Sequence, residues 1–318
     1  MKVALAGEAL IDFTSLGSMR FQGYFGGSPL NTAVAVARLG QSAGYVTQLS
    51  TDLFGVRLRR HLEENGVDTH LVLSHPAPTT LAFVERDGDV NRYQFLAGGS
   101  ADSLYAPVPL PTLPKETAFL HFGSVSLLAE PAATSITQLV ERHCDRVTVV
   151  FDPNVRSTLI PDSDAYRRRF AEWIHCTHLL KLSEDDAAYL AGSADVDEAI
   201  AQWLDAGPLA VVVTSGASGA RLYRRNAEPL VVPAFRVRVA DTIGAGDTLT
   251  AATIVALLER GVLRPPGLAE LPTDDWRQIL EFAAAAAAVN CTRHGANPPT
   301  RQEVSKLLAR EGKAPEPG

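Results

Sequence analysis

The sequence predicts an α/β protein with a mainly parallel central sheet and a small β-sheet attached to it. Short β-branched or apolar runs alternate with longer amphipathic stretches over most of the 318 residues, as expected for βαβ units. Two segments, about 12–25 and 70–100, interrupt this alternation and have the composition of strands and turns. The chain is 46% hydrophobic and 20% charged, so it can cover both faces of a large sheet with apolar side chains.

The strands of the large sheet are predicted where short apolar runs occur. These are 3–6, 44–49, 118–122, 147–151, 178–182 and 210–214. Amphipathic helices are predicted between several of them, over 30–39, 53–65, 132–142 and 166–175. Strands that are separated by helices pair in parallel, because each crossover returns the chain to the same end of the sheet. A further β-pattern, 235–239, precedes a glycine-rich loop.

The small sheet is predicted from a hairpin pattern in the second interrupting segment. TLAFVER (80–86) leads to the turn DGD (87–89), and NRYQF (91–95) follows; Asp-Gly between two β-rich runs is a strong hairpin signal. Such a sheet could close over a cleft or form an oligomerisation surface, and the two roles are compatible. We therefore expect one domain, 1–310, with a lid made of 12–25 and 70–100, and a disordered tail at 311–318.

Composition excludes several classes of protein. A net charge of −7 argues against a nucleic-acid partner, since neutralising phosphates needs a basic surface. The three cysteines, Cys144, Cys176 and Cys291, are odd in number and widely spaced, so a reducing compartment is expected rather than a disulfide framework. The first apolar run is interrupted by Glu8 and Asp12, and no run approaches the roughly 20 apolar residues of a membrane span. A cytoplasmic protein without a membrane partner is expected.

The loop DTIGAGD (241–247) is the most informative stretch. Gly244 and Gly246 allow the backbone to present successive N–H groups at a helix N-terminus, which favours an anion such as phosphate. Asp247 lies beside that site, where its carboxylate would repel a bound anion, so a functional role is indicated. One such role is to accept a proton from a hydroxyl that attacks a phosphoryl group. The alternative is that Asp247 simply caps the helix.

Two nucleotide-binding motifs are absent. No Walker A loop occurs, and Gly244-x-Gly246 lacks the third glycine of the dinucleotide fingerprint, because Leu249 stands there. A nicotinamide-dependent oxidoreductase therefore has little support.

A second glycine loop, GGSPLN (26–31), precedes a helical run. Its paired glycines permit close approach of a ligand, and Asn31 offers both donors and acceptors; a plain capped helix is the alternative.

Together the loops GGSPLNTAVAVARLG (26–40) and DTIGAGD (241–247) resemble the two signatures of the ribokinase-like (PfkB) carbohydrate kinase family. Further segments have family counterparts in the same order: GEALIDF (7–13), DLFG (52–55), FGSVSL (122–127), DPNVR (152–156) and VTSGASGA (213–220). The resemblance implies a three-layer αβα body with a β-sheet lid, and phosphorylation of a small polyol by ATP.

The resemblance also implies roles for individual residues. Asp247 would be the catalytic base, and the backbone of Gly244, Ala245 and Gly246 would form the anion hole. The sugar would be contacted by residues of the lid and its surroundings, namely Asp12, Gly27, Asn31, Phe95 and Arg156. The nucleotide would be held by Lys181, Ser183, Thr214, Gly216 and Gly219, with Ala283 and Ala284 near adenine. The six consecutive alanines there are equally typical of close helix packing.

Metal sites are implied with departures from the family pattern. The Asn-x-x-Glu motif, tied to magnesium and phosphate, appears here as SEDD (183–186), so Asp186 would contact Mg²⁺ with a side chain one methylene shorter, through water. A second set matches positions that often hold a monovalent cation: Asp241, Ile243, Asn290, Arg293 and Gly295. Most of those ligands would be main-chain carbonyls, so the sequence leaves open whether K⁺ is used.

The segments GEALIDF, FGSVSL and AEPA look most like the fructokinase branch. The branch that phosphorylates 2-keto-3-deoxygluconate is close, and Arg156 could serve a carboxylated sugar or join the lid to the body. The segment QFLAGG (94–99) is apolar and small, and Phe95 lacks the hydroxyl that nucleoside-phosphorylating members provide. We expect a neutral sugar, fructose, with ribose or nucleoside kinases as alternatives. The intact GAGD loop argues against a non-catalytic sugar-binding regulator. A homodimer through the lid is a further expectation.

Overall fold

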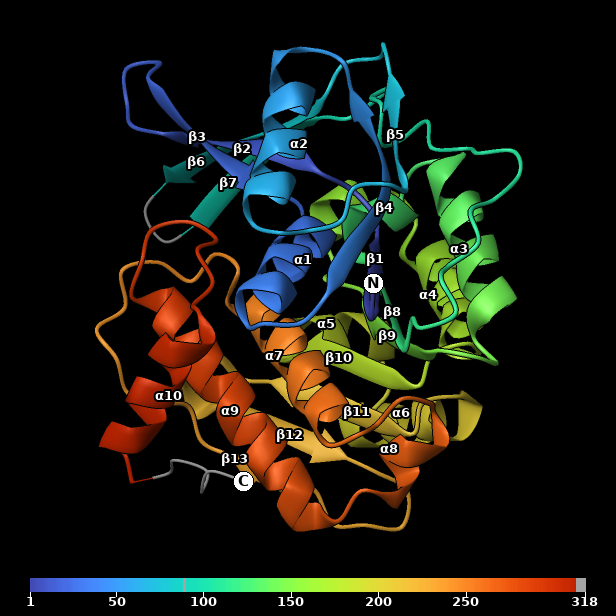
Figure 1. Cartoon of the computed structure of the whole chain (residues 1–318), viewed down its shortest axis with the longest axis vertical. Helices are drawn as coiled ribbons and strands as arrows, with labels where there is room; N and C mark the ends of the chain where they lie inside the picture. Colours follow the sequence, from blue (N-terminus) through green and yellow to red (C-terminus); the bar gives the residue numbers. More distant parts are fainter. Residues whose placement is uncertain (88–89, 313–318) are drawn as a thin grey trace.

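Within residues 1–87 and 90–312, which this computed structural model describes, nine strands form one large sheet (Figure 1). Their order is β13-β12-β11-β10-β9-β8-β1-β4-β5. From β11 to β5 every neighbouring pair is parallel, whereas β12 and β13 complete one edge in antiparallel fashion. The structure thereby confirms the predicted α/β fold with a mainly parallel sheet.

The strands of the large sheet lie close to their predicted positions. They are β1 (Val3–Ala6), β4 (Ala43–Ser50), β5 (Val72–His75), β8 (Phe119–Gly123), β9 (Thr148–Asp152), β10 (Leu179–Ser183), β11 (Ala210–Thr214), β12 (Ala220–Tyr223) and β13 (Leu230–Val232). Of these, β1 and β11 have the predicted bounds.

Helices cover both faces of the sheet (Figure 1). One layer contains α1 (Ser28–Arg38), α2 (Leu53–Glu64), α7 (Ala245–Glu259), α9 (Thr273–Cys291) and α10 (Arg301–Arg310). The other contains α3 (Ala132–His143), α4 (Ser163–Ile174), α5 (Glu184–Ala191) and α6 (Val196–Ala206). None of the helices in the described ranges combines the length and the apolar character that crossing a membrane requires.

The sheet separates two hydrophobic cores. In β11, Ala210 and Val212 belong to the core under α1, α7 and α9, whereas Val211 and Val213 belong to the core under α3, α4 and α6. Successive side chains of a strand point to opposite faces, so a strand that is buried on both sides is continuously apolar. This explains why the central strands appear in the sequence as unbroken runs rather than as alternating patterns.

The small sheet has the order β3-β2-β6-β7. It consists of β2 (Leu10–Ser15), β3 (Phe21–Gly26), β6 (Thr80–Asp87) and β7 (Val90–Leu96). The two sequence-distant hairpins join through the parallel pair β2–β6. The segment 70–100 is not all lid, however, because β5 pairs with β4 at the edge of the large sheet. Residues 88–89 of the expected hairpin turn (87–89) and residues 313–318 of the expected tail (311–318) lie outside the described residues.

Two other expectations need correction. Residues 235–239 do not form a strand, although their pattern alternates. Val239 is 59% exposed there, so the alternation does not bury one face against a neighbouring strand, which is what stabilises such a segment. The proline-rich stretch 262–275 is not all loop, because the short helix α8 (Pro266–Glu270) lies within it and buries Leu268.

Candidate active site

The loop before α7 turns sharply at a glycine. Gly244 is the N-cap residue of α7 and has a φ of 76°, in the left-handed region that favours glycine. A Cβ at this position would lie 2.7 Å from the Cβ of Ala296, so a side chain could not be accommodated. The first N–H groups of a helix have no partner inside it, and they can therefore bind an anion. Among those of α7, the Ala245 N–H donates to the Thr242 carbonyl at 3.2 Å.

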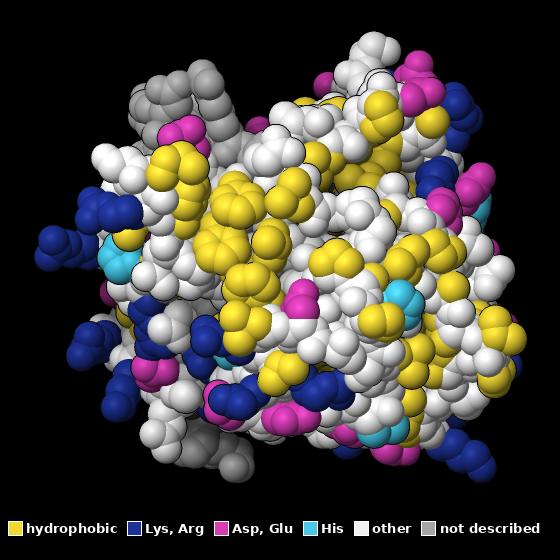
Figure 2. Space-filling view, turned by 90° about the horizontal axis from the view of Figure 1, so that it is seen from above, with side chains coloured by type: hydrophobic (Ala, Val, Ile, Leu, Met, Phe, Trp, Pro, Cys, Tyr) yellow, Lys and Arg dark blue, Asp and Glu magenta, His cyan; other side chains and the backbone are white. Residues whose placement is uncertain are grey.

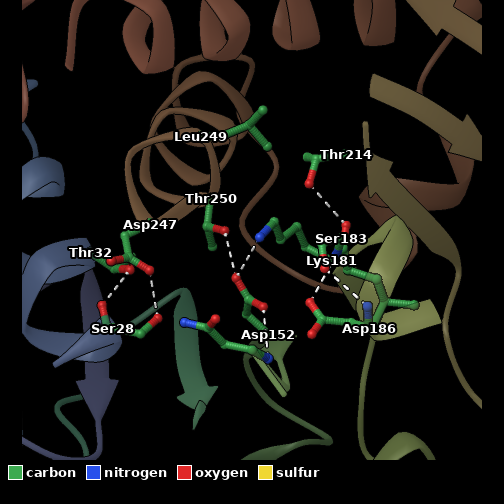
Figure 3. Close-up of polar contacts among 12 residues, drawn as sticks. Ser28, Thr32, Asp152, Lys181, Ser183, Asp186, Thr214, Asp247, Leu249 and Thr250 are labelled. Atoms are coloured by element: carbon green, nitrogen blue, oxygen red, sulfur yellow. Dashed lines mark hydrogen bonds and ion pairs between the residues drawn. The ribbon is translucent and has the colours of Figure 1, made fainter. Parts of the chain in front are cut away.

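Asp247 lies in the first turn of α7 and is almost fully buried. Its Oδ1 accepts a hydrogen bond of 2.6 Å from the Ser28 hydroxyl, and its Oδ2 accepts one of 2.8 Å from the Asn31 side-chain amide. Figure 3 shows the Ser28 and Asp247 side chains turned toward each other across the two helices. The carboxylate does not cap α7, because the cap residue is Gly244 and its cap has no side-chain hydrogen bond. It is held by the first turn of α1 instead.

Burial raises the pKa of the Asp247 carboxyl group, and the nearby charge of Asp152 adds to this effect. The hydrogen bonds from Ser28 and Asn31 and the charge of Lys181 act in the opposite direction. The group therefore binds a proton more readily than an exposed aspartate does. A base of that kind is suited to accept a proton from a hydroxyl during a reaction near neutral pH.

A buried cation lies beside the same helix terminus. The Lys181 Nζ, from β10, is 3.0 Å from the Oδ2 of Asp152 at the end of β9 (Figure 3). Burial lowers the pKa of Lys181, but the carboxylates of Asp152, Asp186 and Asp247 raise it more, so the net shift is upward and the side chain stays an ammonium. A Cβ on Gly246 would lie 2.8 Å from that nitrogen. The ammonium therefore lies beside the N-terminus of α7, and an anion bound there can contact both.

The inner face of the small sheet carries Asp12. Register pairs Asp12 with Tyr24 and Ala82, and pairs Ala82 with Phe95, so these residues form one row on one face of the sheet. Burial raises the pKa of Asp12 to about 6; the Arg156 charge opposes this shift and the Asp247 charge increases it. These effects indicate that Asp12 of the small sheet lies close to Arg156 and Asp247.

Arg156 is fixed near this row by the segment that follows β9. Its Nη1 donates to the Oδ1 of Asn154 at 2.6 Å and to the main-chain oxygen of Val155 at 3.3 Å. Gly27, the other predicted sugar contact, is the N-cap residue of α1, directly before Ser28. The predicted sugar-binding residues therefore come from the small sheet, from the start of α1 and from the end of β9. Of these, Asn31 bonds to Asp247 and the charges of Asp12 and Asp247 act on each other.

The predicted nucleotide residues lie at the carboxyl ends of the neighbouring strands β10 and β11. The Thr214 hydroxyl donates to the Leu182 carbonyl at 3.2 Å, and Gly216 and Gly219 bound a short 3₁₀ turn. The two predicted adenine contacts differ, because Ala283 has no exposed surface whereas Ala284 is 7% exposed. Both alanines belong to the packing between α9 and the core, and their contact with adenine stays a prediction.

Asp186 is bound by main-chain groups on both carboxylate oxygens. Its Oδ2 accepts from the Ser183 N–H at 2.9 Å in a capping box at the start of α5, and its Oδ1 accepts from the Val155 N–H at 2.8 Å. The described residues contain no group of three or more His, Cys, Asp or Glu that could hold a metal. Each oxygen of the Asp186 carboxylate keeps a second lone pair, so a divalent ion that retains its waters can contact it. The Mg²⁺ assignment stays a prediction.

The predicted monovalent-cation residues do come together. The Asp241 carboxylate accepts from the N–H groups of Ile243 at 3.1 Å and Gly295 at 2.9 Å, and the Asn290 amide donates to the Ile243 carbonyl at 2.8 Å. Arg293 is ion-paired with Glu303. The chain itself occupies these oxygens in part, and the use of a cation stays a prediction.

Sequence reasoning gave no site role to Ser28 or Asp152. Both lie in segments that resemble family motifs, and the sequence around each contains a feature that could have indicated a place in the site. Ser28 precedes Asn31 by three residues in a helix, so the two side chains share a face. Asp152 ends a fully buried strand, and the carboxyl ends of parallel strands are where ligands bind in open α/β sheets.

Comparison with known proteins identifies close relatives. A family profile described as pfkB family carbohydrate kinase matches residues 2–303. Fructokinase-1 of Oryza sativa subsp. japonica is 35% identical over 317 residues, which cover 95% of this chain and 96% of that protein. A fructokinase of Rhizobium leguminosarum bv. trifolii is 33% identical over 273 residues, covering 85% and 83%. The structure of fructokinase with bound ATP from Xylella fastidiosa has a TM-score of 0.89 at 29% identity, covering 98% of this chain and 100% of that one.

Proposed function

The chain belongs to the pfkB family of carbohydrate kinases, and on that premise we propose that it transfers the γ-phosphoryl group of ATP to a hydroxyl group of fructose. The observation that carries the chemistry is the Asp247 carboxylate, held by Ser28 and Asn31 at the same helix terminus that faces the Lys181 ammonium. The fructokinase relatives and the apolar Phe95 on the inner face of the small sheet support a neutral ketohexose as the acceptor.

In the proposed reaction Asp247 accepts the proton of the attacking sugar hydroxyl. The sugar oxygen forms a bond to the γ-phosphorus while the bond from that phosphorus to the bridging oxygen of ADP breaks. The N–H groups of Gly244, Ala245 and Gly246 and the Lys181 ammonium stabilise the negative charge on the phosphoryl group in transit. Magnesium, when bound with ATP, neutralises phosphate charge, and Asp186 would hold it through water. A monovalent cation would bind at Asp241 and Ile243.

The sugar contacts in this proposal come from the small sheet (Asp12), from the start of α1 (Gly27 and Asn31) and from the segment after β9 (Arg156). Closure of the small sheet over the site would exclude water, which would otherwise compete as the acceptor. Arg156 supports a second candidate substrate, because a guanidinium in the sugar site would also bind the carboxylate of 2-keto-3-deoxygluconate.

A direct test is sugar-dependent ADP release, measured with purified protein, ATP and Mg²⁺ over a panel of acceptors. The panel contains fructose, ribose, 2-keto-3-deoxygluconate, adenosine and aminoimidazole riboside. We expect the highest kcat/KM with fructose. A higher value with 2-keto-3-deoxygluconate would replace the substrate but keep the mechanism, whereas no release with any acceptor would leave a non-catalytic sugar-binding protein. We also propose the cytoplasm as the site of action, where Cys144 and Cys176, whose sulfurs lie 3.0 Å apart, would stay free thiols.

We also propose a homodimer through the outer face of the small sheet, the face that carries Phe13 and Phe83. Helix α2 covers part of this face, since Phe13 meets Phe54 edge-on at 5.8 Å. Phe13 stacks on Phe83 with ring centroids 5.2 Å apart, and Phe21 meets Phe83 edge-on at 5.4 Å. Leu96 of the same sheet and Leu53 of α2 are 54% and 62% exposed. Figure 2, a view onto this end of the molecule, shows hydrophobic side chains gathered in one patch. A second copy is the occupant that would cover a contiguous apolar face of this kind.

A further inference from the structure

We infer that Glu8 and Ser28 are positioning residues for the catalytic base: Glu8 fixes the first turn of α1, and Ser28 in that turn fixes the Asp247 carboxylate. The inference rests on the proposed function and adds two residues to it. It is carried by a continuous set of hydrogen bonds among buried groups, in which Glu8 and Ser28 are 2% and 7% exposed.

The start of α1 lacks a cap of its own. Its N-cap residue is Gly27, and no side-chain hydrogen bond caps it there, although the first N–H groups of a helix need partners from outside. Glu8, in the connection between β1 and β2, supplies one, because its Oε1 accepts from the Ser28 N–H at 3.1 Å. A carboxylate at a helix N-terminus is also favoured by the helix dipole. Glu8 therefore acts as a cap that the fold brings in from twenty residues away.

Glu8 is itself fixed on two further sides. Its Oε2 accepts from the Ser126 N–H at 3.2 Å, and the Tyr45 hydroxyl donates to its main-chain oxygen. Ser126 belongs to the short turn that follows β8, and Tyr45 belongs to β4. Glu8 thus joins α1 to the carboxyl edge of the large sheet, so the helix start cannot shift or rotate independently of the sheet.

Ser28, which is held in place by Glu8, in turn orients the carboxylate of Asp247. It lies three residues before Asn31, and the two side chains hold one oxygen of Asp247 each, at 2.6 and 2.8 Å. With both oxygens held, the carboxylate has one orientation, and each oxygen keeps a lone pair for the substrate hydroxyl. Positioning of this kind raises the rate of a proton transfer without adding a reacting group.

The hydroxyl of Ser28 also has an electrostatic effect. A hydrogen bond to a carboxylate favours its charged form, so removing the hydroxyl raises the pKa of Asp247. The charged groups that act on Asp247 are Lys181, Asp152 and Asp12, and none of them changes in a Ser28 variant. Any shift in the pKa of Asp247 in a Ser28 variant therefore results from the lost hydrogen bond.

The test is Ser28→Ala, assayed with fructose and ATP across pH. We expect kcat near neutral pH to fall about tenfold or more, as for loss of a hydrogen bond to a charged group, with KM for ATP unchanged. The acid limb of the kcat profile moves to higher pH, so the loss is smaller in alkaline buffer. Ser28→Thr, which keeps the hydroxyl, restores most of the rate. Ser135→Ala in α3, an equally buried serine at 7% exposure, is the matched control and leaves kcat unchanged. A kcat within twofold of wild type and an unmoved acid limb in Ser28→Ala would overturn the inference.

A double-mutant cycle distinguishes positioning of the base from a general structural role. In an Asp247→Asn background, Ser28→Ala causes little additional loss if Ser28 acts through Asp247; an equal loss in both backgrounds contradicts the inference. Glu8→Gln keeps the size of the side chain but cannot accept both N–H groups, so kcat falls while the circular dichroism spectrum stays native. An unchanged kcat in Glu8→Gln removes Glu8 from the inference. If Asp247→Asn alone keeps normal turnover, the proposed base is wrong, an outcome separate from all of these.

Discussion

The ammonium group of Lys181 lies 3.0 Å from the Oδ2 of Asp152, and both side chains are almost wholly buried at 8% and 1% exposure. A buried ion pair is costly unless its remaining hydrogen-bonding capacity is used. Thr250 in α7 supplies part of it, at 3.4 Å from the same Asp152 oxygen. The pair thereby attaches the carboxyl edge of the sheet to α7 and keeps a positive charge beside Gly246.

Gly246→Ala tests this arrangement. The new Cβ would lie 2.8 Å from the Lys181 Nζ, so the ammonium has to move away from the helix terminus. We expect kcat/KM for ATP to fall about tenfold or more, because donors at a developing charge contribute strongly to the rate. Gly267→Ala in α8 is the matched control, since its Cβ would have its nearest neighbour at 3.4 Å, an ordinary contact. Equal kinetics in the two variants would contradict the anion site.

Asp247→Asn tests the base. The amide keeps the size of the side chain and can still bond to Ser28, but it cannot accept the proton of a sugar hydroxyl. We expect kcat to fall by a factor of about 10² to 10⁴, the usual contribution of a general base, while ATP binding measured by calorimetry stays within a factor of about two of wild type. Near-normal turnover would exclude Asp247 from the role.

Asp12 predicts a pH effect on sugar use. Burial raises its pKa to about 6, so the carboxylate is lost as pH falls through that value and with it an acceptor for sugar hydroxyls. The kcat/KM for fructose should therefore decline below about pH 6. In Asp12→Asn the KM for fructose rises, KM for ATP does not, and the part of the decline that belongs to Asp12 is lost, while protonation of Asp247 still lowers the rate in acid. A pH profile of kcat/KM that is the same in wild type and variant would count against Asp12 as a sugar contact.

The fold followed from the sequence where burial alone decides structure. Strand β11 is apolar at four of its five positions because it is covered on both faces, and its bounds agree with the prediction. Apolar and polar residues alternate over 235–239, but this segment pairs with no sheet. Such a period indicates that one face could be buried, and it does not show that a neighbouring strand is present. The sequence predicts β5 as part of the lid, whereas it pairs with β4. The order of strands in the sequence does not show which sheet has an unpaired edge for the next strand.

The site was less predictable than the fold, because the sequence does not show which elements pack against each other. The glycine loops and Asp247 carry local signals, but Ser28 and Asp247 meet only through the packing of α1 against α7. The role of Asp152 depends likewise on Lys181 of the neighbouring strand. Such pairings are tertiary facts, and single-sequence patterns do not contain them.

Glu8 predicts a pH dependence of stability. Burial raises its pKa from 4.5 to about 7, so between these values the folded state holds a proton that the unfolded state has lost. Stability therefore falls as pH rises through this window. The shift corresponds to about 3 kcal/mol at 1.36 kcal/mol per pKa unit. Denaturant unfolding of wild type and Glu8→Gln should show the difference between their free energies of unfolding changing by about that amount from pH 4.5 to 7. A constant difference would mean that Glu8 titrates normally.

The outer face of the small sheet predicts self-association. Phe83→Ser removes the aromatic ring that both Phe13 and Phe21 contact, so a dimer through this face should weaken by an order of magnitude or more in sedimentation experiments, as for loss of a central anchor residue. Val108→Ser, at a valine that is 96% exposed, is the control and leaves the dimer intact. A wild-type protein that stays monomeric at all concentrations would refute the dimer.

The hydrogen bond between Ser28 and Asp247 joins residues 219 positions apart. Translation proceeds from the N-terminus, so the first glycine loop, the small sheet and most of the large sheet have left the ribosome before Asp247 is made. The residues proposed to bind the sugar are thus synthesised well before the proposed catalytic base. The catalytic base arrives among the last parts of the enzyme, and a truncated product of interrupted synthesis would lack it altogether.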